Sequence, residues 1–319
     1  MSEKKPLVVL TGPTAVGKTA LSIELAKRIN GEMISADSMQ VYKLMDIGTA
    51  KIMPEEMDGI KHHLIDVLDP KEDFNVVTFK NMAVAALEEI YSRNKIPIVV
   101  GGTGFYIQAL LYDIAFENTE VSSYRKELEE YAKKNGAHAL HERLLEIDPV
   151  SYKEIHENNV KRVIRALEFY HDTGYPISKH NEEERQKESP YNFAYFVLNH
   201  DRKILYDRIE QRIDMMLEQG LVEEVAKLLD YGCGKNMVSM QGLGYKEIIP
   251  YLQGECNLDE AIYILKRDTR HFAKRQLTWF RREKEVTWVE KQELKSEEAI
   301  LDYMIQHLKE KQILPMYNE

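Results

Sequence analysis

A motif near the N-terminus has the residue types and spacing of a phosphate-binding loop. Residues 12–19 match G-x-x-x-x-G-K-[ST], with an apolar run before them at 7–10 and a helix-forming stretch after them at 20–29. In such a loop, backbone N–H groups and the helix N-terminus face the phosphate oxygens, Lys18 adds a positive charge, and Thr19 offers its hydroxyl to Mg2+. The motif predicts a bound diphosphate or triphosphate without saying what carries it. Its members are Gly12, Pro13, Thr14, Ala15, Val16, Gly17, Lys18 and Thr19.

Two polar residues that follow other predicted strands are candidates for chemistry. Asp37 follows a strand predicted at 32–36, and Thr103 follows a glycine pair after a strand predicted at 96–100. Most phosphate-loop kinases and hydrolases place a Mg2+-organising acid after a later strand, but residues 101–104 contain no carboxylate. Because the carboxyl ends of parallel strands converge on the ligand crevice, we expect Asp37 and Thr103 to meet the phosphate loop. The alternative is that each residue only caps a helix, since such polar residues are favoured N-caps.

A basic run in the C-terminal half is open to two interpretations. Residues 261–285 carry eight Lys or Arg against three acids. On a helix, Arg267, Arg270, Lys274 and Arg281 approximate one face, while Phe272, Leu277 and Phe280 can turn inward. A solvated charged face is the usual explanation for such a run. Because this face is nearly all of one sign, however, it favours a polyanionic partner that offsets the self-repulsion.

Two smaller patterns carry less weight. His62 and His63 with Asp66 could suggest zinc, but a third ligand is not evident and catalytic zinc usually takes three protein ligands. Cys233 and Cys256 are too few for a metal cluster, and we expect free thiols in a reducing cytoplasm.

The elements that position these residues predict an α/β fold with a P-loop NTPase-like parallel sheet flanked by helices. Between 114 and 192 the pattern is helical without a strand, which predicts an all-helical insertion domain; the catalytic core then comprises 1–113 and 193–319. Asn75 is positioned to cap one core helix. The predicted core strands are 6–11, 32–36, 96–100, 193–198 and 286–289, and the core helices are 18–30, 76–93, 103–112, 202–219, 221–231, 258–283 and one from about 296. The predicted insertion helices are 122–134, 137–147 and 160–173.

Composition narrows the class of protein. The 319 residues are 44% hydrophobic and 30% charged, and no run approaches the ~18 apolar residues that would span a bilayer. The first five residues lead directly into a strand, so we expect no signal peptide, no membrane and a cytoplasmic location. The net charge of −10 argues weakly against a nucleic-acid partner, although the local basic run argues for one.

Taken together, the motifs resemble the tRNA dimethylallyltransferase family, the tRNA adenosine isopentenyltransferases, in its bacterial type. The resemblance runs in order from about residue 7 to 290. Besides the phosphate loop it covers residues 34–42, 45–51, 62–66, 101–106, 162–168, 242–247 and 270–282. It implies transfer of a dimethylallyl group from dimethylallyl diphosphate to N6 of the adenosine 3′-adjacent to the anticodon, in tRNAs reading codons that start with U, giving N6-isopentenyladenosine.

The resemblance also assigns roles to residues. Asp37 is the general base, Thr103 assists at the diphosphate or the amine, and Thr19 holds Mg2+, which is the cofactor. Arg208 or Arg212, which the sequence does not separate, completes the clamp on the diphosphate.

The expected partners are the anticodon stem-loop of tRNA and dimethylallyl diphosphate, and the protein is expected to be a monomer. Implied tRNA contacts are Asp37, Ser38, Met39, Gln40, Thr103, Arg125, Lys161, Arg162, Val163, Ile164, Arg165, Gln241, Gly242, Leu243, Gly244, Tyr245, Lys246, Arg270 and Arg281. Two other hypotheses stay open: a P-loop small-molecule or nucleotide kinase, which the loop alone would favour, and a tRNA-binding regulator without activity.

Overall fold

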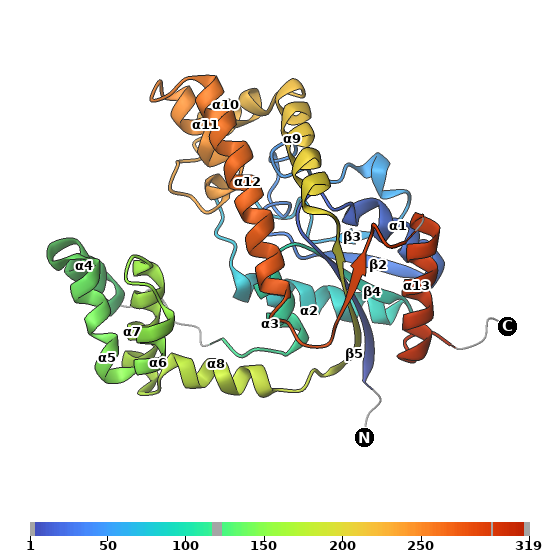
Figure 1. Cartoon of the computed structure of the whole chain (residues 1–319), viewed down its shortest axis with the longest axis horizontal. Helices are drawn as coiled ribbons and strands as arrows, with labels where there is room; N and C mark the ends of the chain where they lie inside the picture. The colour runs from blue at the N-terminus through green and yellow to red at the C-terminus, as the bar shows by residue number, and fades with distance from the viewer. Residues whose placement is uncertain (1–3, 117–122, 295, 316–319) are drawn as a thin grey trace. The chain divides into compact units, whose positions relative to one another are not determined.

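The computed structural model describes residues 4–116, 123–294 and 296–315 (Figure 1). Residues 1–3, which entered the expectation of no signal peptide, lie outside the described residues. So does residue 122, the predicted start of the helix at 122–134. The chain divides into two compact units: the first comprises residues 1–111 and 190–319, and the second comprises residues 112–189. The sequence placed the insertion at 114–192, and the second unit of the structure spans residues 112–189.

A six-stranded parallel sheet forms the centre of the first unit, in the order β3-β2-β4-β1-β5-β6. The parallel sheet predicted from the sequence is confirmed, including the return of the chain at β5 beside β1. The sequence did not predict β3, a two-residue edge strand. The strands are β1 (Lys5–Thr11), β2 (Gly31–Ser35), β3 (His62–His63), β4 (Ile96–Gly101), β5 (Tyr191–Asn199) and β6 (Val286–Glu290).

Helices cover both faces of this sheet (Figure 1). Helices α1 and α13 pack on one face, and α2 and α3 pack on the other. The opposite placement of α1 and α2 is what right-handed crossover connections require, because the chain moves across the sheet in opposite directions from β1 to β2 and from β3 to β4. The helices are α1 (Lys18–Ile29), α2 (Val76–Ser92), α3 (Gly104–Leu111), α9 (Arg202–Glu218), α10 (Leu221–Asp230), α11 (Tyr245–Leu252), α12 (Leu258–Phe280) and α13 (Glu297–Glu310), with short 3-10 turns at Pro54–Met57 and Ser239–Gln241.

Local sequence explains where several of these helices begin and end. Asn75 caps α2 as predicted, because its side-chain oxygen accepts from the backbone N–H groups of Val77 and Thr78 at 2.9 and 3.1 Å. Helix α12 ends at Phe280, three residues before the predicted end at 283. Helix α11 was not predicted, since Pro250 lies inside it.

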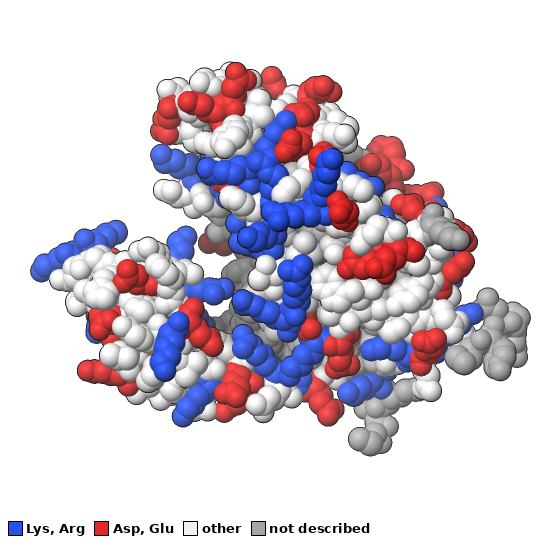
Figure 2. Space-filling model, in the orientation of Figure 1, with Lys and Arg blue, Asp and Glu red and all other residues white. Residues whose placement is uncertain are grey.

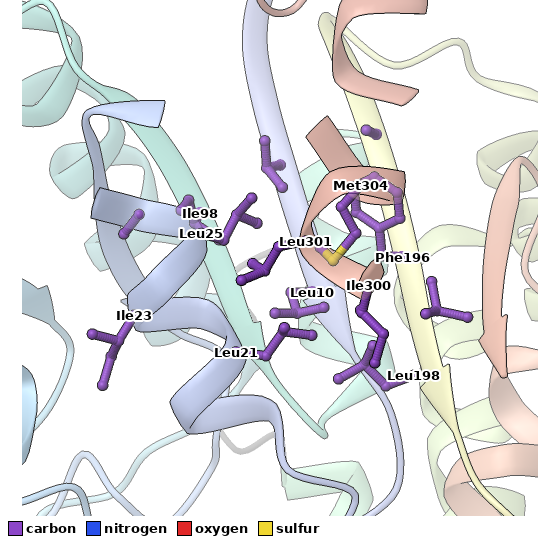
Figure 3. Close-up of a cluster of buried hydrophobic side chains, with 14 of the residues drawn as sticks. Leu10, Leu21, Ile23, Leu25, Ile98, Phe196, Leu198, Ile300, Leu301 and Met304 are labelled. Carbon is purple, nitrogen blue, oxygen red and sulfur yellow. The ribbon is translucent and has the colours of Figure 1, made fainter. Parts of the chain in front are cut away.

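The hydrophobic core beneath α1 holds the phosphate loop in place. Leu21 and Leu25 of α1 pack against Leu10 of β1, Phe196 of β5 and Met304 of α13 (Figure 3). Burying one such side chain stabilises the fold by roughly 1.5–3 kcal/mol. Both elements that flank residues 12–17 are therefore anchored in the same core, so the loop between them has little freedom to move.

The second unit consists of helices and loops, with no strand in its described part. It contains α4 (Ser123–Glu142), α5 (Leu144–Ile147), α6 (Pro149–Glu154), α7 (Val160–Thr173) and α8 (Ile177–Gln186). Gly136 interrupts α4 with a φ of +88°, close to the predicted break between two helices, and Gly174 ends α7 in a left-handed conformation. Helices α6 and α8 were not predicted. The buried Asp148 connects them, because its carboxylate accepts from the hydroxyls of Ser151 and Ser178 at 2.7 and 2.6 Å.

Across the described ranges, no helix combines the length and the hydrophobicity needed to cross a membrane.

Candidate active site

The phosphate loop joins the C-terminal end of β1 to the start of α1. Gly12 and Gly17 have φ values of +147° and +92°, a region that disfavours other residues. A Cβ on Gly12 would also lie 2.5 Å from the carbonyl oxygen of Leu198 on β5. The Nζ of Lys18 donates to the carbonyls of Gly12 and Pro13 at 3.0 Å each, so the ammonium lies back over the loop.

Neighbouring strand ends bring the three sequence candidates together. Strands β2, β4 and β1 are adjacent in the sheet, and they end before Asp37, Thr103 and the phosphate loop respectively. The Thr103 N–H donates to the carbonyl of Ala36 at 3.2 Å. A Cβ on Gly101 would lie 2.3 Å from the Ala36 backbone, so the two strand ends touch.

Electrostatics place the Asp37 carboxylate among the cations of the loop. Burial, reinforced by the charge of Arg212, lowers the pKa of Lys18 to about 8, while Asp37 opposes that shift. Burial also lowers the pKa of the Arg212 guanidinium, and Asp37 again opposes the shift. The site therefore holds two partly buried cations and one carboxylate, an excess of positive charge that suits an anionic ligand.

The capping alternatives are partly correct. The Oδ1 of Asp37 accepts from the N–H groups of Met39 and Gln40 at 2.8 and 3.3 Å, but these residues form a turn and no helix starts at Ser38. Both bonds end on Oδ1, and within the described residues no hydrogen bond reaches Oδ2. The carbonyl of Thr103 accepts the N–H groups of Tyr106 and Ile107 at 3.0 and 3.3 Å, so its backbone starts α3.

The structure separates the two candidate arginines. Arg212 donates from Nη2 to the hydroxyl of Thr14 in the phosphate loop. Arg208 lies one turn earlier on α9 and is exposed; its charge contributes, after burial, to the lowered pKa of His200. Arg212 is therefore the arginine at the loop.

The residues around Thr19 fit a magnesium ion that is held mainly by a ligand's phosphates. Thr19 is exposed in the first turn of α1, and in the described chain its hydroxyl makes no hydrogen bond. No group of three or more His, Cys, Asp or Glu side chains converges anywhere in the described residues. Mg2+ commonly binds through one or two protein oxygens together with substrate phosphates, so the Thr19 hydroxyl beside the loop suffices as an anchor.

Two segments implied in RNA binding meet beside Asp37. A Cβ on Gly242 would lie 2.9 Å from the sulfur of Met39, so the turn at 38–40 packs directly on residues 241–246. Gln241 and Lys246 are exposed, whereas Gly244 is buried and Leu243 half-buried. Tyr245 is fully buried, so its side chain supports the surface instead of forming it.

A buried carboxylate that the sequence did not reveal holds the segment after this turn. Glu224 accepts the N–H groups of Asp46, Ile47 and Gly48 at 2.8–3.0 Å and the Tyr245 hydroxyl at 2.7 Å. The same segment holds Gln40, whose Nε2 donates to the carbonyls of Thr49 and Ala50. An acid among the apolar positions of α10 was the only available signal of this role.

The basic face of α12 is only partly free. Lys266 pairs with Asp214 and Arg270 with Glu210, each at 2.6 Å, so the single-sign face expected from the sequence is wrong for the first half of the run. The cations of the second half, Lys274, Arg275, Arg281 and Arg282, have no ion pair among the residues described. Figure 2 shows Lys and Arg side chains gathered on the face above α9 and α12. Phe280 is buried as expected, while Phe272 and Leu277 are half-buried.

Two of these cations, Lys274 and Arg281, border a cavity of about 360 Å³ between α9 and α12. Arg202, Lys274 and Arg281 contribute charge, and Leu205 and Leu277 contribute an apolar wall.

In the second unit, one buried carboxylate orders two arginines. Glu168 accepts from Nε and Nη2 of Arg125 at 3.0 and 2.6 Å and from Nη1 of Arg165 at 3.4 Å. Lys161 and Arg162 are exposed. Val163 and Ile164, which the resemblance implied in RNA binding, are buried in the core of this unit, so their side chains hold α7 in place.

The histidine pair has a structural role. His63 lies 3.1 Å from Glu32, which is also paired with Arg93, and His62 contacts the carbonyl of Ile60 at 2.8 Å. The zinc interpretation finds no third ligand in the described chain. Cys233 and Cys256 are free thiols, as predicted.

Comparison with known proteins identifies the family. A family model described as IPP transferase matches residues 40–283. The chain belongs to the IPP transferase family. The tRNA dimethylallyltransferase of Lachnoclostridium phytofermentans is 62% identical over 97% of this chain and 99% of its own. That of Acetivibrio thermocellus is 55% identical over 92% of this chain and 95% of its own.

Solved structures of IPP transferases agree with this fold. The full-length tRNA isopentenylpyrophosphate transferase of Bacillus halodurans is 45% identical, covers 99% of this chain and 100% of its own, and superposes with a TM-score of 0.72. A eukaryotic dimethylallyltransferase acting on tRNA is 30% identical over 90% of this chain and 74% of its own, with a TM-score of 0.77. These matches confirm the family and the fold class predicted from the motifs, and they make the chain a transferase.

Proposed function

We propose that this IPP transferase moves a dimethylallyl group from dimethylallyl diphosphate to N6 of the adenosine 3′-adjacent to the anticodon. The substrates are tRNAs that read codons starting with U, and the product is N6-isopentenyladenosine. One observation supports this most directly: Asp37 is the carboxylate whose charge acts on both Lys18 and Arg212 beside the phosphate loop. The relatives named above carry this activity in their names.

The phosphate loop suits a leaving diphosphate. In the transfer, the bond between the allylic carbon and the diphosphate oxygen breaks as the bond to nitrogen forms, and negative charge accumulates on the departing pyrophosphate. The loop amides, Lys18 and Arg212 would stabilise that charge, the kind of preorganised electrostatic effect that is often the largest contribution to catalysis. Mg2+, held by Thr19 and the diphosphate, would add further positive charge when bound.

Asp37 suits the role of general base. The exocyclic amine of adenine is a poor nucleophile because its lone pair is delocalised into the ring, so removal of its proton assists attack. A carboxylate in position contributes typically ~10²–10⁴-fold. Its Oδ1 is engaged with backbone N–H groups of the following turn, and Oδ2 remains available for the proton.

The acceptor is a base that must leave its stack. Enzymes that modify a base draw it out of the nucleic-acid stack, and the bases of a single-stranded loop can be splayed out for recognition. The turn at 38–40, the exposed Gln241 and Lys246, and the free cations of α12 would contact the loop and its phosphates. We place the reaction in the cytoplasm, with the protein as a monomer.

Nucleoside mass spectrometry tests the proposal. tRNA incubated with enzyme, Mg2+ and dimethylallyl diphosphate should gain a dimethylallyl mass increment on adenosine. Asp37→Ala should retain tRNA binding and lose nearly all transfer. An unmodified adenosine with the wild-type enzyme would overturn the proposal, and full turnover by the variant would overturn the role of Asp37.

The same enzyme preparation distinguishes the proposed prenyl transfer from the kinase alternative. Residues 101–104 offer no acid to organise Mg2+ around a γ-phosphate. Incubation with ATP and small-molecule or nucleotide acceptors should therefore give no phosphoryl transfer.

A further inference from the structure

Gln276 of α12 bridges the two sides of the active site. Its Oε1 accepts the backbone N–H of Thr14 in the phosphate loop at 2.9 Å, and its Nε2 donates to the carbonyl of Gly102, beside Thr103, at 3.0 Å. The side chain is 6% exposed, so water does not compete for these bonds. One buried amide thus satisfies a donor on one strand end and an acceptor on the next.

The space around Thr103 is shaped by the same helix. A Cβ on Gly102 would lie 2.2 Å from Nε2 of Gln276, and a Cβ on Gly104 would lie 2.2 Å from Cδ1 of Trp279. The glycines on either side of Thr103 therefore leave room for two side chains of α12, one turn apart.

The bridge extends to the arginine of the loop. Thr14, whose N–H bonds to Gln276, accepts the bond from Arg212 through its hydroxyl. The contacts run without a break from Arg212 through Thr14 and Gln276 to Gly102, which precedes Thr103. These contacts therefore fix Arg212 and the phosphate loop, which would bind the diphosphate, relative to the segment that carries Thr103.

We propose that Gln276 is a positioning residue that sets the spacing between the phosphate loop and Thr103, and with it the alignment of the allylic donor. This inference rests on the proposed function for its catalytic consequence. Without the amide, the Thr14 N–H and the Gly102 carbonyl lose their shared partner, and the middle of the loop at Thr14 loses its tie to the strand end at Gly102. Displacement of reacting groups by about 1 Å can lower a rate ~10²-fold.

Two variants with different chemistry test the bridge. Gln276→Ala should raise the KM for dimethylallyl diphosphate about 10-fold and lower kcat ~10²-fold, with tRNA affinity unchanged. Gln276→Glu keeps an acceptor for Thr14, but as a carboxylate it turns an oxygen toward the Gly102 carbonyl. Only the protonated acid can donate there, and burial raises the pKa of a carboxyl group. Its activity relative to wild type should therefore rise by about 10-fold from pH 8.5 to pH 6.

A binding measurement keeps this inference separate from the proposed function. Calorimetry with Mg2+ and inorganic pyrophosphate reports the loop without tRNA; Gln276→Ala should bind about 10-fold more weakly, and Gln306→Ala, an exposed glutamine on α13, should bind as wild type does. If the wild-type enzyme binds pyrophosphate but leaves tRNA unmodified, only the proposed function fails. Wild-type pyrophosphate affinity in Gln276→Ala, or a Gln276→Glu pH profile parallel to that of wild type, would overturn the role of Gln276.

Discussion

Removing the guanidinium of Arg212 should separate catalysis from stability. In the free protein the charged guanidinium is unfavourable for stability, because burial lowers its pKa and its charge lowers the pKa of Lys18. Its contacts with Thr14 and its attraction to Asp37 offset that cost only in part. Its benefit should appear when a diphosphate occupies the loop. We therefore expect Arg212→Ala to be about as stable as wild type, within ~1 kcal/mol, because the lost bond and the relieved repulsion oppose each other.

The catalytic loss should be large. Deleting one preorganised group that stabilises developing negative charge typically lowers kcat by ~10²–10³-fold, or about 2.7–4 kcal/mol. Arg212→Ala should fall in that range for kcat/KM of dimethylallyl diphosphate. The variant should also shift the basic limb of the pH–rate profile upward, because Arg212 no longer lowers the pKa of Lys18.

Arg208 provides the matched control on the same helix. It carries the same charge one turn away but is exposed and acts on His200, so Arg208→Ala should change kcat/KM less than about threefold. Steady-state and single-turnover transfer to an anticodon stem-loop, with thermal unfolding in parallel, measures both variants. Equal losses in the two variants, or a near-wild-type rate in Arg212→Ala, would refute the assignment.

Three further outcomes are expected. Glu224→Gln should lower the free energy of unfolding in urea by about 3 kcal/mol, because an amide cannot accept every N–H that the carboxylate accepts; exposed Glu223→Gln should stay within ~0.5 kcal/mol. The kcat/KM for the donor should fall above about pH 8, where Lys18 loses its proton, and Lys18→Arg should lack that fall. Lys274→Ala should reduce the slope of log tRNA affinity against log salt by about 1, whereas Lys266→Ala, whose ammonium pairs with Asp214, should change it less.

The parts of this site that the sequence predicted are those whose geometry is encoded locally. The phosphate loop needs positive φ at fixed positions, and Gly12 and Gly17 occur at that spacing. Asp37 and Thr103 could be placed because each follows an apolar strand, and strand ends of a parallel sheet share one edge. Local patterns also predicted the cap of α2.

The parts that the sequence did not reveal depend on segments far apart in the chain. Gln276 contacts a loop residue 262 positions earlier, and nothing in its neighbourhood distinguishes it from a surface glutamine. The pairing of Arg270 with Glu210 likewise depends on how α12 packs against α9, so counting charges along one helix overstated its free positive charge. Helix α8 was missed because its sequence is highly polar, and its start is fixed by the distant Asp148.

The electrostatic arrangement explains why the free site is ready for an anion. Lys18 and Arg212 both have lowered pKa values, which means that the fold positions them in spite of their mutual repulsion and burial. Asp37 counters this repulsion only in part, so an incoming diphosphate relieves the remaining repulsion between Lys18 and Arg212. Because a bound anion restores the pKa of Lys18, ligand binding near pH 8 is coupled to proton uptake at that residue. The same coupling makes the departing pyrophosphate, with its growing negative charge, the state that the cations stabilise most.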